Sequence, residues 1–271
     1  MASGSPVFIV STGRAGSNMI ARVLAAHPAL FSIHEPLPDL NTEAYSKWAG
    51  RHGRAKILAH IGHKRGALIE QVEHNGLLYV EASHFCAHLI PELAETYHAR
   101  FIHLYRDGRD FVRSGLERPR WYAEEGRSRL AVALEFVKRQ ARRQFLIDVG
   151  STWDDHKLAP PISMRSRAEK IAWLWVEINR VILESLAALP REQSMSLALE
   201  QLQRDSLIRV LDFIGVEADA PVLERMVRIA ETKPNRTRVR RVPPVEEWSG
   251  HERTRFSEIA GAMMRKLGYT V

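Results

Sequence analysis

The sequence has little cysteine and no long apolar run. Its 271 residues include one cysteine, Cys86, so no internal disulfide can form, which fits a reducing compartment. No apolar run approaches the roughly 20 residues of a membrane span. The first residues have no basic start, and the apolar run Pro6–Val10 is too short for a signal peptide. We therefore predict a cytoplasmic protein without a membrane span.

Acidic side chains are the minority among the charged residues. The chain has 39 Lys and Arg against 32 Asp and Glu, a formal net charge of +7 at pH 7. This excess attracts anions, and composition alone leaves nucleic acid, acidic lipid and phosphate-rich small molecules open as partners. The hydrophobic content of 45% is that of a globular protein with a substantial core.

Short apolar segments and amphipathic segments alternate along the chain. This alternation predicts βαβ units, and hence an α/β fold with a central parallel sheet flanked by helices. The expected strands are Val7–Val10, Phe31–Ile33, Leu77–Val80, Arg100–Tyr105 and Ser194–Leu199. The expected helices are Met19–Leu24, much of Asn41–Asn75, Leu89–Tyr97, Asp110–Leu116, Ala168–Leu189, Leu202–Ile214, Val222–Ala230 and Glu252–Leu267.

Residues 118–167 interrupt this alternation. The segment is charged, contains one long helical candidate at Leu130–Leu146, and ends in the loop-like stretch Gly150–Ser163. We expect a single domain over residues 1–271 in which 118–167 is a helical insertion, serving as a lid or an acceptor-side element.

Two glycines follow the first strand and precede the first helix. Gly13 and Gly16 allow the backbone to approach an oxyanion closely, and the helix N-terminus directs amides at the bound charge. Arg14 between them can bind two oxygens at once. The segment is therefore predicted to bind phosphate, the alternative being a glycine turn without a ligand. The residues expected at the anion are Gly13, Arg14, Ala15, Gly16, Ser17 and Asn18.

The segment lacks the lysine of a Walker A motif. That motif has four residues between its glycines and then Lys-Ser/Thr, whereas two residues separate Gly13 from Gly16 and no lysine follows. A magnesium-dependent NTPase is disfavoured for this reason, although a small-molecule kinase of P-loop-like fold stays an alternative.

A second group of basic and hydroxyl side chains follows the strand Arg100–Tyr105. Arg106 stands at the strand end, and Ser114 and Arg118 are four residues apart on the next helix. Open α/β sheets bind ligands at the carboxyl ends of their strands. Two such anion sites suggest one ligand with phosphate at both ends.

These motifs resemble those of the sulfotransferases that use 3′-phosphoadenosine-5′-phosphosulfate. Gly13–Asn18 is similar to the family's first motif, and Phe101–Ser114 resembles the second, an apolar strand followed by Arg-Asp-x-Arg-Asp and a downstream serine. The pattern is closest to the tyrosylprotein branch. Further resemblances, in the family's order, are Trp173–Asn179, Leu199–Leu202, Phe213–Gly215 and Ile259–Tyr269.

The resemblance implies a three-layer P-loop-NTPase-like fold and transfer of a sulfuryl group to a hydroxyl or amine by in-line attack, without a metal. Gly13–Asn18 would bind the 5′-phosphosulfate, and Arg106 and Ser114, joined by Arg118, the 3′-phosphate. Lys233 and Arg236, in a basic segment that the family closes over the cofactor, are further candidates. The product would be adenosine 3′,5′-bisphosphate. The acceptor is a small molecule or peptide whose identity, like the oligomeric state, the sequence leaves open.

Sulfuryl transfer requires a base for the acceptor's proton. The segment Ala26–Pro36 resembles one that leads to a glutamate base in tyrosylprotein sulfotransferases, and Glu35 occupies that position. A short strand Phe31–Ile33 would bring Glu35 to the ligand edge of the sheet, where it acts as base or only pairs with Arg14. His34 is the rival base, since cytosolic members use histidine.

Many family members carry a catalytic lysine that this chain lacks at the matching positions. Arg14 stands in the first motif, and the sequence from Glu81 to His84 follows the strand Leu77–Val80. Either Arg14 supplies the positive charge alone, or His84 or Lys233 assists, or the protein is a catalytically weak nucleotide-binding protein. A nucleic-acid-binding module is disfavoured, because these arginines stand at separate strand ends rather than along one face with aromatic residues.

Overall fold

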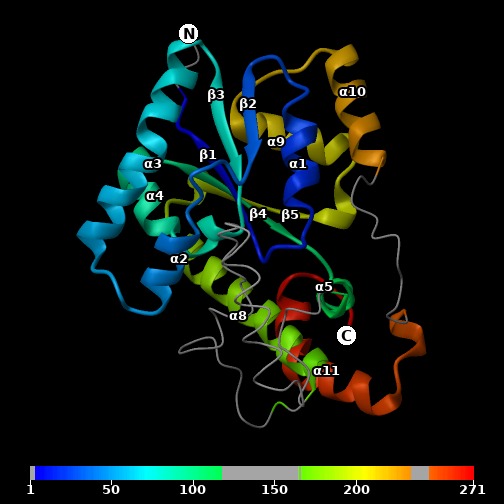
Figure 1. Cartoon of the computed structure of the whole chain (residues 1–271). Coiled ribbons are helices and arrows are strands. Elements are labelled where there is room, and N and C mark those ends of the chain that lie inside the picture. The colour runs from blue at the N-terminus through cyan, green and yellow to red at the C-terminus, as the bar shows by residue number, and fades with distance from the viewer. Residues whose placement is uncertain (1–3, 118–163, 165, 233–243) are drawn as a thin grey trace, which may run out of the picture. The chain divides into compact units, whose positions relative to one another are not determined.

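The computed structural model describes residues 4–117, 164, 166–232 and 244–271 (Figure 1). The chain forms two compact units. The first comprises Met1–Asp107 and Glu177–Val239, and the second comprises Gly108–Val176 and Arg240–Val271. The predicted insertion helix Leu130–Leu146 lies outside the described residues, so the insertion and the single domain stay predictions.

The first unit contains a five-stranded parallel sheet in the order β2-β3-β1-β4-β5. All five predicted strands are confirmed, with small shifts at their ends, and with them the α/β fold class. Because β1 lies in the middle, β3 and β4 follow on opposite sides of it, and this reversal creates a switch point at the carboxyl edge. The strands are β1 (Val7–Ser11), β2 (Leu30–His34), β3 (Leu78–Ala82), β4 (Arg100–Tyr105) and β5 (Ser194–Ala198).

Both faces of the central strand β1 are buried, as its continuous apolar sequence predicts. On one face, Val7 and Ile9 join an apolar cluster with residues of α1, α9 and α10. On the other face, the ring of Phe8 lies 6.1 Å from that of Tyr79 and 6.2 Å from that of Phe101. Figure 1 shows α1, α9 and α10 on one side of the sheet and α3 and α4 on the other, which gives the three layers.

Helices cover the sheet of the first unit where periodicity predicts them. The expected helical stretch Asn41–Asn75 consists of two helices, α2 and α3, separated by the turn that contains Gly50 and Gly53. The helices that lie entirely in this unit are α1 (Ser17–Leu24), α2 (Asn41–Trp48), α3 (Arg54–His74), α4 (Ile90–Tyr97), α9 (Arg204–Ile214) and α10 (Ala220–Glu231), with 3-10 turns η1 (Phe85–His88), η2 (Arg191–Gln193) and η3 (Leu199–Gln201).

The second unit contains α5 (Gly108–Leu116), the 3-10 turn η4 (Val245–Glu247) and α11 (Gly250–Lys266). It also contains the first part of α8 (Arg167–Ala187), the long amphipathic helix predicted from its apolar spacing. Glu169 of α8 forms an ion pair of 2.9 Å with Arg255 of α11. No helix in the described part of the chain is long and apolar enough to cross a membrane.

Candidate active site

The segment between β1 and α1 has the backbone conformation that its glycines predict. Gly13 and Gly16 have φ angles of 73° and 88°, and Arg14 between them has φ of 49°. A positive φ costs a side-chain-bearing residue about 1 kcal/mol or more, so the turn at Arg14 is strained. The hydroxyl of Ser11 accepts the N–H of Gly13 at 3.2 Å, which closes the turn from the strand side.

The N-terminus of α1 lacks both a side-chain cap and an acidic residue in its own first turn. Gly16 is the N-cap residue, no side chain caps the helix, and the first turn contains no acidic residue. The amides at this end and the helix dipole therefore favour an anion. A methyl group at Gly16 would lie 2.6 Å from Cδ1 of Leu199, so a larger residue would need the Leu199 side chain to shift and would also be strained by the positive φ.

Arg106 links the end of β4 to this segment. Its Nη1 donates to the carbonyl oxygen of Arg14 at 2.9 Å, which brings two of the predicted anion-binding arginines together. Ser114 lies on α5 in the second unit. The other three predicted cofactor-binding residues, Arg118, Lys233 and Arg236, lie outside the described residues.

Glu35 lies immediately after β2 and contacts a histidine from the neighbouring strand's end. Its Oε1 is 2.6 Å from Nδ1 of His84, and its N–H donates to the carbonyl of Ala82 at 3.2 Å. Glu35 has φ of 46°. The non-glycine residues with positive φ in the described ranges are Arg14, Glu35 and His98, so two of the three are predicted catalytic residues.

His34 connects Glu35 with the glycine segment. Its Nε2 lies 3.0 Å from the Ser17 hydroxyl and 3.6 Å from Oε1 of Glu35. His84 is also close to this segment, because a methyl group at Gly13 would lie 3.6 Å from its Cγ. The structure therefore places both candidate bases beside the predicted phosphate-binding turn.

Burial and charge set the protonation of the two candidate bases. Burial alone raises the pKa of Glu35, but the hydrogen bond from His84 and the charges of His84 and His34 outweigh it, and the net pKa is lowered. Burial also lowers the pKa of His34, against the opposing charge of Glu35. At neutral pH the Glu35 side chain is therefore a carboxylate, and the imidazole of His34 is neutral.

The pairing of His84 with Glu35 is the feature that the sequence did not predict. The two residues are 49 positions apart. They meet because β2 and β3 are adjacent, with His34 in register with Ala82. A histidine two residues after one strand and a glutamate directly after the neighbouring strand are a usable signal once the strand order is known.

A family model described as a sulfotransferase domain matches residues 5–239. Three solved structures share the fold. The sulfotransferase domain from the curacin biosynthetic pathway is 13% identical with a TM-score of 0.53, and the alignment covers 99% of each chain. The sulfotransferase domain of the Synechococcus PCC 7002 olefin synthase is 16% identical with a TM-score of 0.50, covering 100% of this chain and 98% of that one.

The third structure, sulfotransferase STF9 from Mycobacterium avium, is 11% identical with a TM-score of 0.57. The alignment covers 100% of this chain and 79% of that chain. Among curated proteins, none is significantly similar to this chain in sequence. At these identities the solved structures show a common fold and carry no residue-level assignment.

Proposed function

The chain belongs to the sulfotransferase domain family, and from this premise we propose that it transfers a sulfuryl group from 3′-phosphoadenosine-5′-phosphosulfate to a hydroxyl or amine, with Glu35 as the general base. One observation carries the proposal. The Glu35 carboxylate lies 2.6 Å from His84 and, through His34 and Ser17, next to the anion-binding turn. This arrangement supports a base beside the proposed phosphosulfate position.

The residues of the turn fit the phosphosulfate end of the donor. Gly13 and Gly16 present backbone rather than side chain, and the uncapped start of α1 offers amides. Arg14 supplies a full positive charge at the same turn, and Ser17 and Asn18 follow at the first helical positions. When bound, the donor supplies the activated sulfuryl group.

Arg106 is the residue of the proposed 3′-phosphate set that lies in the same unit as the turn. Its contact with the Arg14 carbonyl leaves its guanidinium near the end of β4, at the edge where parallel sheets bind ligands. Ser114 and Arg118 join this set on the family resemblance alone, and Lys233 and Arg236 stay candidates for closing over the adenosine part.

Glu35 is the better base of the two candidates. A general base must be deprotonated and have a lone pair free for the acceptor's proton. The lowered pKa of Glu35 keeps it ionised at neutral pH. The Nε2 of His34 is engaged with the Ser17 hydroxyl at 3.0 Å. If the Ser17 hydroxyl donates its hydrogen to a bound oxyanion, its oxygen accepts a hydrogen bond from Nε2 of His34. This Nε2 then already carries a hydrogen and cannot accept the proton of the acceptor.

Each group then has one role in the transfer. Glu35 accepts the acceptor's proton as the acceptor oxygen or nitrogen attacks sulfur and the bond to the bridging phosphate oxygen breaks. Arg14 and the start of α1 balance the charge that remains on the departing bisphosphate. Because His84 is occupied by Glu35, we assign the charge of the absent family lysine to Arg14.

Calorimetry with adenosine 3′,5′-bisphosphate in magnesium-free buffer tests the proposal. We expect a dissociation constant in the micromolar range for the wild-type protein and a loss of at least about tenfold in Arg106→Ala, the size of one charge-assisted phosphate contact. Arg22→Ala, an exposed arginine in the last turn of α1, is the control and should bind normally. Binding of magnesium–ATP without binding of the bisphosphate would instead indicate a kinase.

A further inference from the structure

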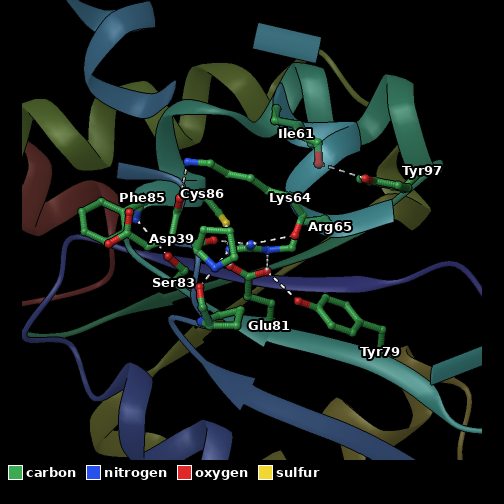
Figure 2. Close-up of polar contacts among 12 residues, drawn as sticks. Asp39, Ile61, Lys64, Arg65, Tyr79, Glu81, Ser83, Phe85, Cys86 and Tyr97 are labelled. Carbon is green, nitrogen blue, oxygen red and sulfur yellow. Dashed lines mark hydrogen bonds and ion pairs between the residues drawn. The ribbon is translucent and has the colours of Figure 1, made fainter. Parts of the chain in front are cut away.

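A fully buried ion pair includes Glu81, which stands three residues before His84. Arg65 of α3 and Glu81 of β3 are 1% and 0% exposed. Two parallel hydrogen bonds join them, from Nε to Oε2 at 2.6 Å and from Nη2 to Oε1 at 3.0 Å. The Tyr79 hydroxyl also donates to Oε2 of Glu81, at 2.8 Å (Figure 2). The proposed transfer reaction uses none of these side chains directly.

Arg65 uses all five of its N–H groups. Besides the two bonds to Glu81, Nη1 donates to the carbonyl oxygens of Pro38 at 2.7 Å and Lys64 at 3.2 Å. Nη2 donates its second hydrogen to the carbonyl of Pro36 at 3.4 Å. A guanidinium has five donors in a fixed plane, and here each has an acceptor. One side chain therefore fixes α3, β3 and the segment 36–38 relative to one another.

The segment 36–38 directly follows Glu35, and within it Pro36 is buried whereas Leu37 and Pro38 are exposed. Pro36 and Pro38 have no N–H, so their carbonyls are their backbone hydrogen-bonding groups. The side chain of Leu37 between them is 86% exposed and stabilises the segment little. The two carbonyl bonds from Arg65 thus position the backbone one to three residues beyond the proposed base.

Glu81 positions the other partner of the contact. It precedes Ala82, whose carbonyl accepts the N–H of Glu35, and it lies three residues before His84. Both members of the Glu35–His84 contact therefore stand within a few residues of groups that bind Arg65. The ion pair lies where it can fix the distance between the ends of β2 and β3.

Stability alone is a weak reason for such a pair. Removing two charges from water is expensive, and apolar side chains of similar volume often replace a buried pair with no loss of stability. We propose that the Arg65–Glu81 ion pair is a positioning device that holds Glu35 against His84 by fixing the backbone on either side of that contact. Its consequence for sulfuryl transfer rests on the function proposed above, whereas the contact itself is measured independently.

The double variant Arg65→Met/Glu81→Leu removes the carbonyl bonds without leaving an unpaired buried charge. The measurement is the carboxyl ¹³C titration of Glu35 by NMR, with the resonance assigned by its loss in Glu35→Gln. Because His84 contributes to the lowered pKa of Glu35, we expect the pKa to rise toward the ordinary glutamate value in the double variant. Melting temperature and bisphosphate binding are recorded on the same samples.

A second, half-buried ion pair provides the control. Lys47, 31% exposed, and Glu92, 3% exposed, form an ion pair of 2.5 Å in the same unit, and no hydrogen bond or ion pair described for either residue reaches residues 36–38. Lys47→Met/Glu92→Leu should leave the Glu35 titration unchanged. An equal rise of the Glu35 pKa in this control would mean general loosening of the unit and would overturn the proposal.

Arg65→Lys keeps the charge opposite Glu81 but lacks the planar set of five donors, so it tests the proposal even if the double variant does not fold. The expected result is a smaller rise of the Glu35 pKa in the same direction. A Glu35 titration identical to wild type in folded Arg65→Lys would overturn positioning by the pair. If the wild-type protein does not bind the bisphosphate, the sulfotransferase proposal is refuted, whereas the result on the Arg65–Glu81 pair still stands.

Discussion

Replacing Glu35 by glutamine tests the proposed base most directly. Glutamine has nearly the same shape as glutamate, and its amide oxygen can still accept the hydrogen bond from Nδ1 of His84, now 2.6 Å from the carboxylate. The substitution therefore removes basicity while the local contact is kept. It also removes one negative charge close to the predicted phosphate-binding turn.

The general contribution of a base to a reaction rate sets the expected loss of kcat. A positioned general base contributes roughly 10²- to 10⁴-fold to a rate, which corresponds to about 3–5 kcal/mol of transition-state stabilisation. We expect kcat of Glu35→Gln to fall within that range. Adenosine bisphosphate should bind as tightly as to wild type or slightly more tightly, because a like charge near the phosphates has been removed.

The assay measures release of adenosine 3′,5′-bisphosphate from the donor, with a phenol as the hydroxyl probe and an aliphatic amine as the amine probe. Calorimetry on the same protein gives the bisphosphate affinity. A kcat within about fivefold of wild type would refute Glu35 as base, and a parallel loss of binding would make it a structural residue. His34→Gln is the companion variant: if it costs more in kcat than Glu35→Gln, the base is His34.

Three further predictions follow from the described contacts. The rate should be constant through neutral pH and fall only as the pH drops through the lowered pKa of Glu35, so a pH–rate profile that falls between pH 6 and 7 would contradict the assignment. His103 is buried, and desolvation lowers its pKa to about 4. The unfolded state therefore binds the proton at a higher pH than the folded state does, so stability should fall as the pH decreases from about 6.5 to about 4. Urea titrations should show a loss that is smaller by about 3 kcal/mol in His103→Gln, while the loss due to His88, whose pKa burial lowers to about 3, remains. Gly16→Ala should destabilise the protein by more than about 1 kcal/mol and weaken bisphosphate binding, and Leu199→Ala should restore stability only in part, because it relieves the 2.6 Å contact but not the positive φ.

Most of the fold could be predicted because its signals are local. The continuous apolar sequence of β1 and the helical spacing in α8 each determine an element without reference to the rest of the chain. The end of β3 shows where this reasoning stops. The expected strand ended at Val80, yet the strand continues through Glu81 to Ala82. Glu81 is tolerated inside the sheet because Arg65, 16 residues earlier, neutralises it.

The candidate site likewise has features that local sequence predicts and features that depend on the strand order. The glycine turn and Glu35 could be predicted because each belongs to a contiguous motif. The contact between Glu35 and His84 could not, because it depends on β2 and β3 being neighbours. Residues 118–163 and 233–243, which contain Arg118, Lys233 and Arg236, lie outside the described residues, so the roles of these three stay predictions.

The strand order has a consequence for the biosynthesis of this protein. β1 leaves the ribosome first, but one of its partners, β4, pairs Val7 with Arg100, and β4 in turn pairs Phe101 with Ser194. Such non-local pairing is slow because long stretches of chain must close before any contact forms. The hydrogen bond from Arg106 to the Arg14 carbonyl in the glycine turn therefore forms only after β4 has been synthesised. A nascent chain halted before β5 would leave the backbone groups along one edge of β4 unpaired, and such edges favour aggregation.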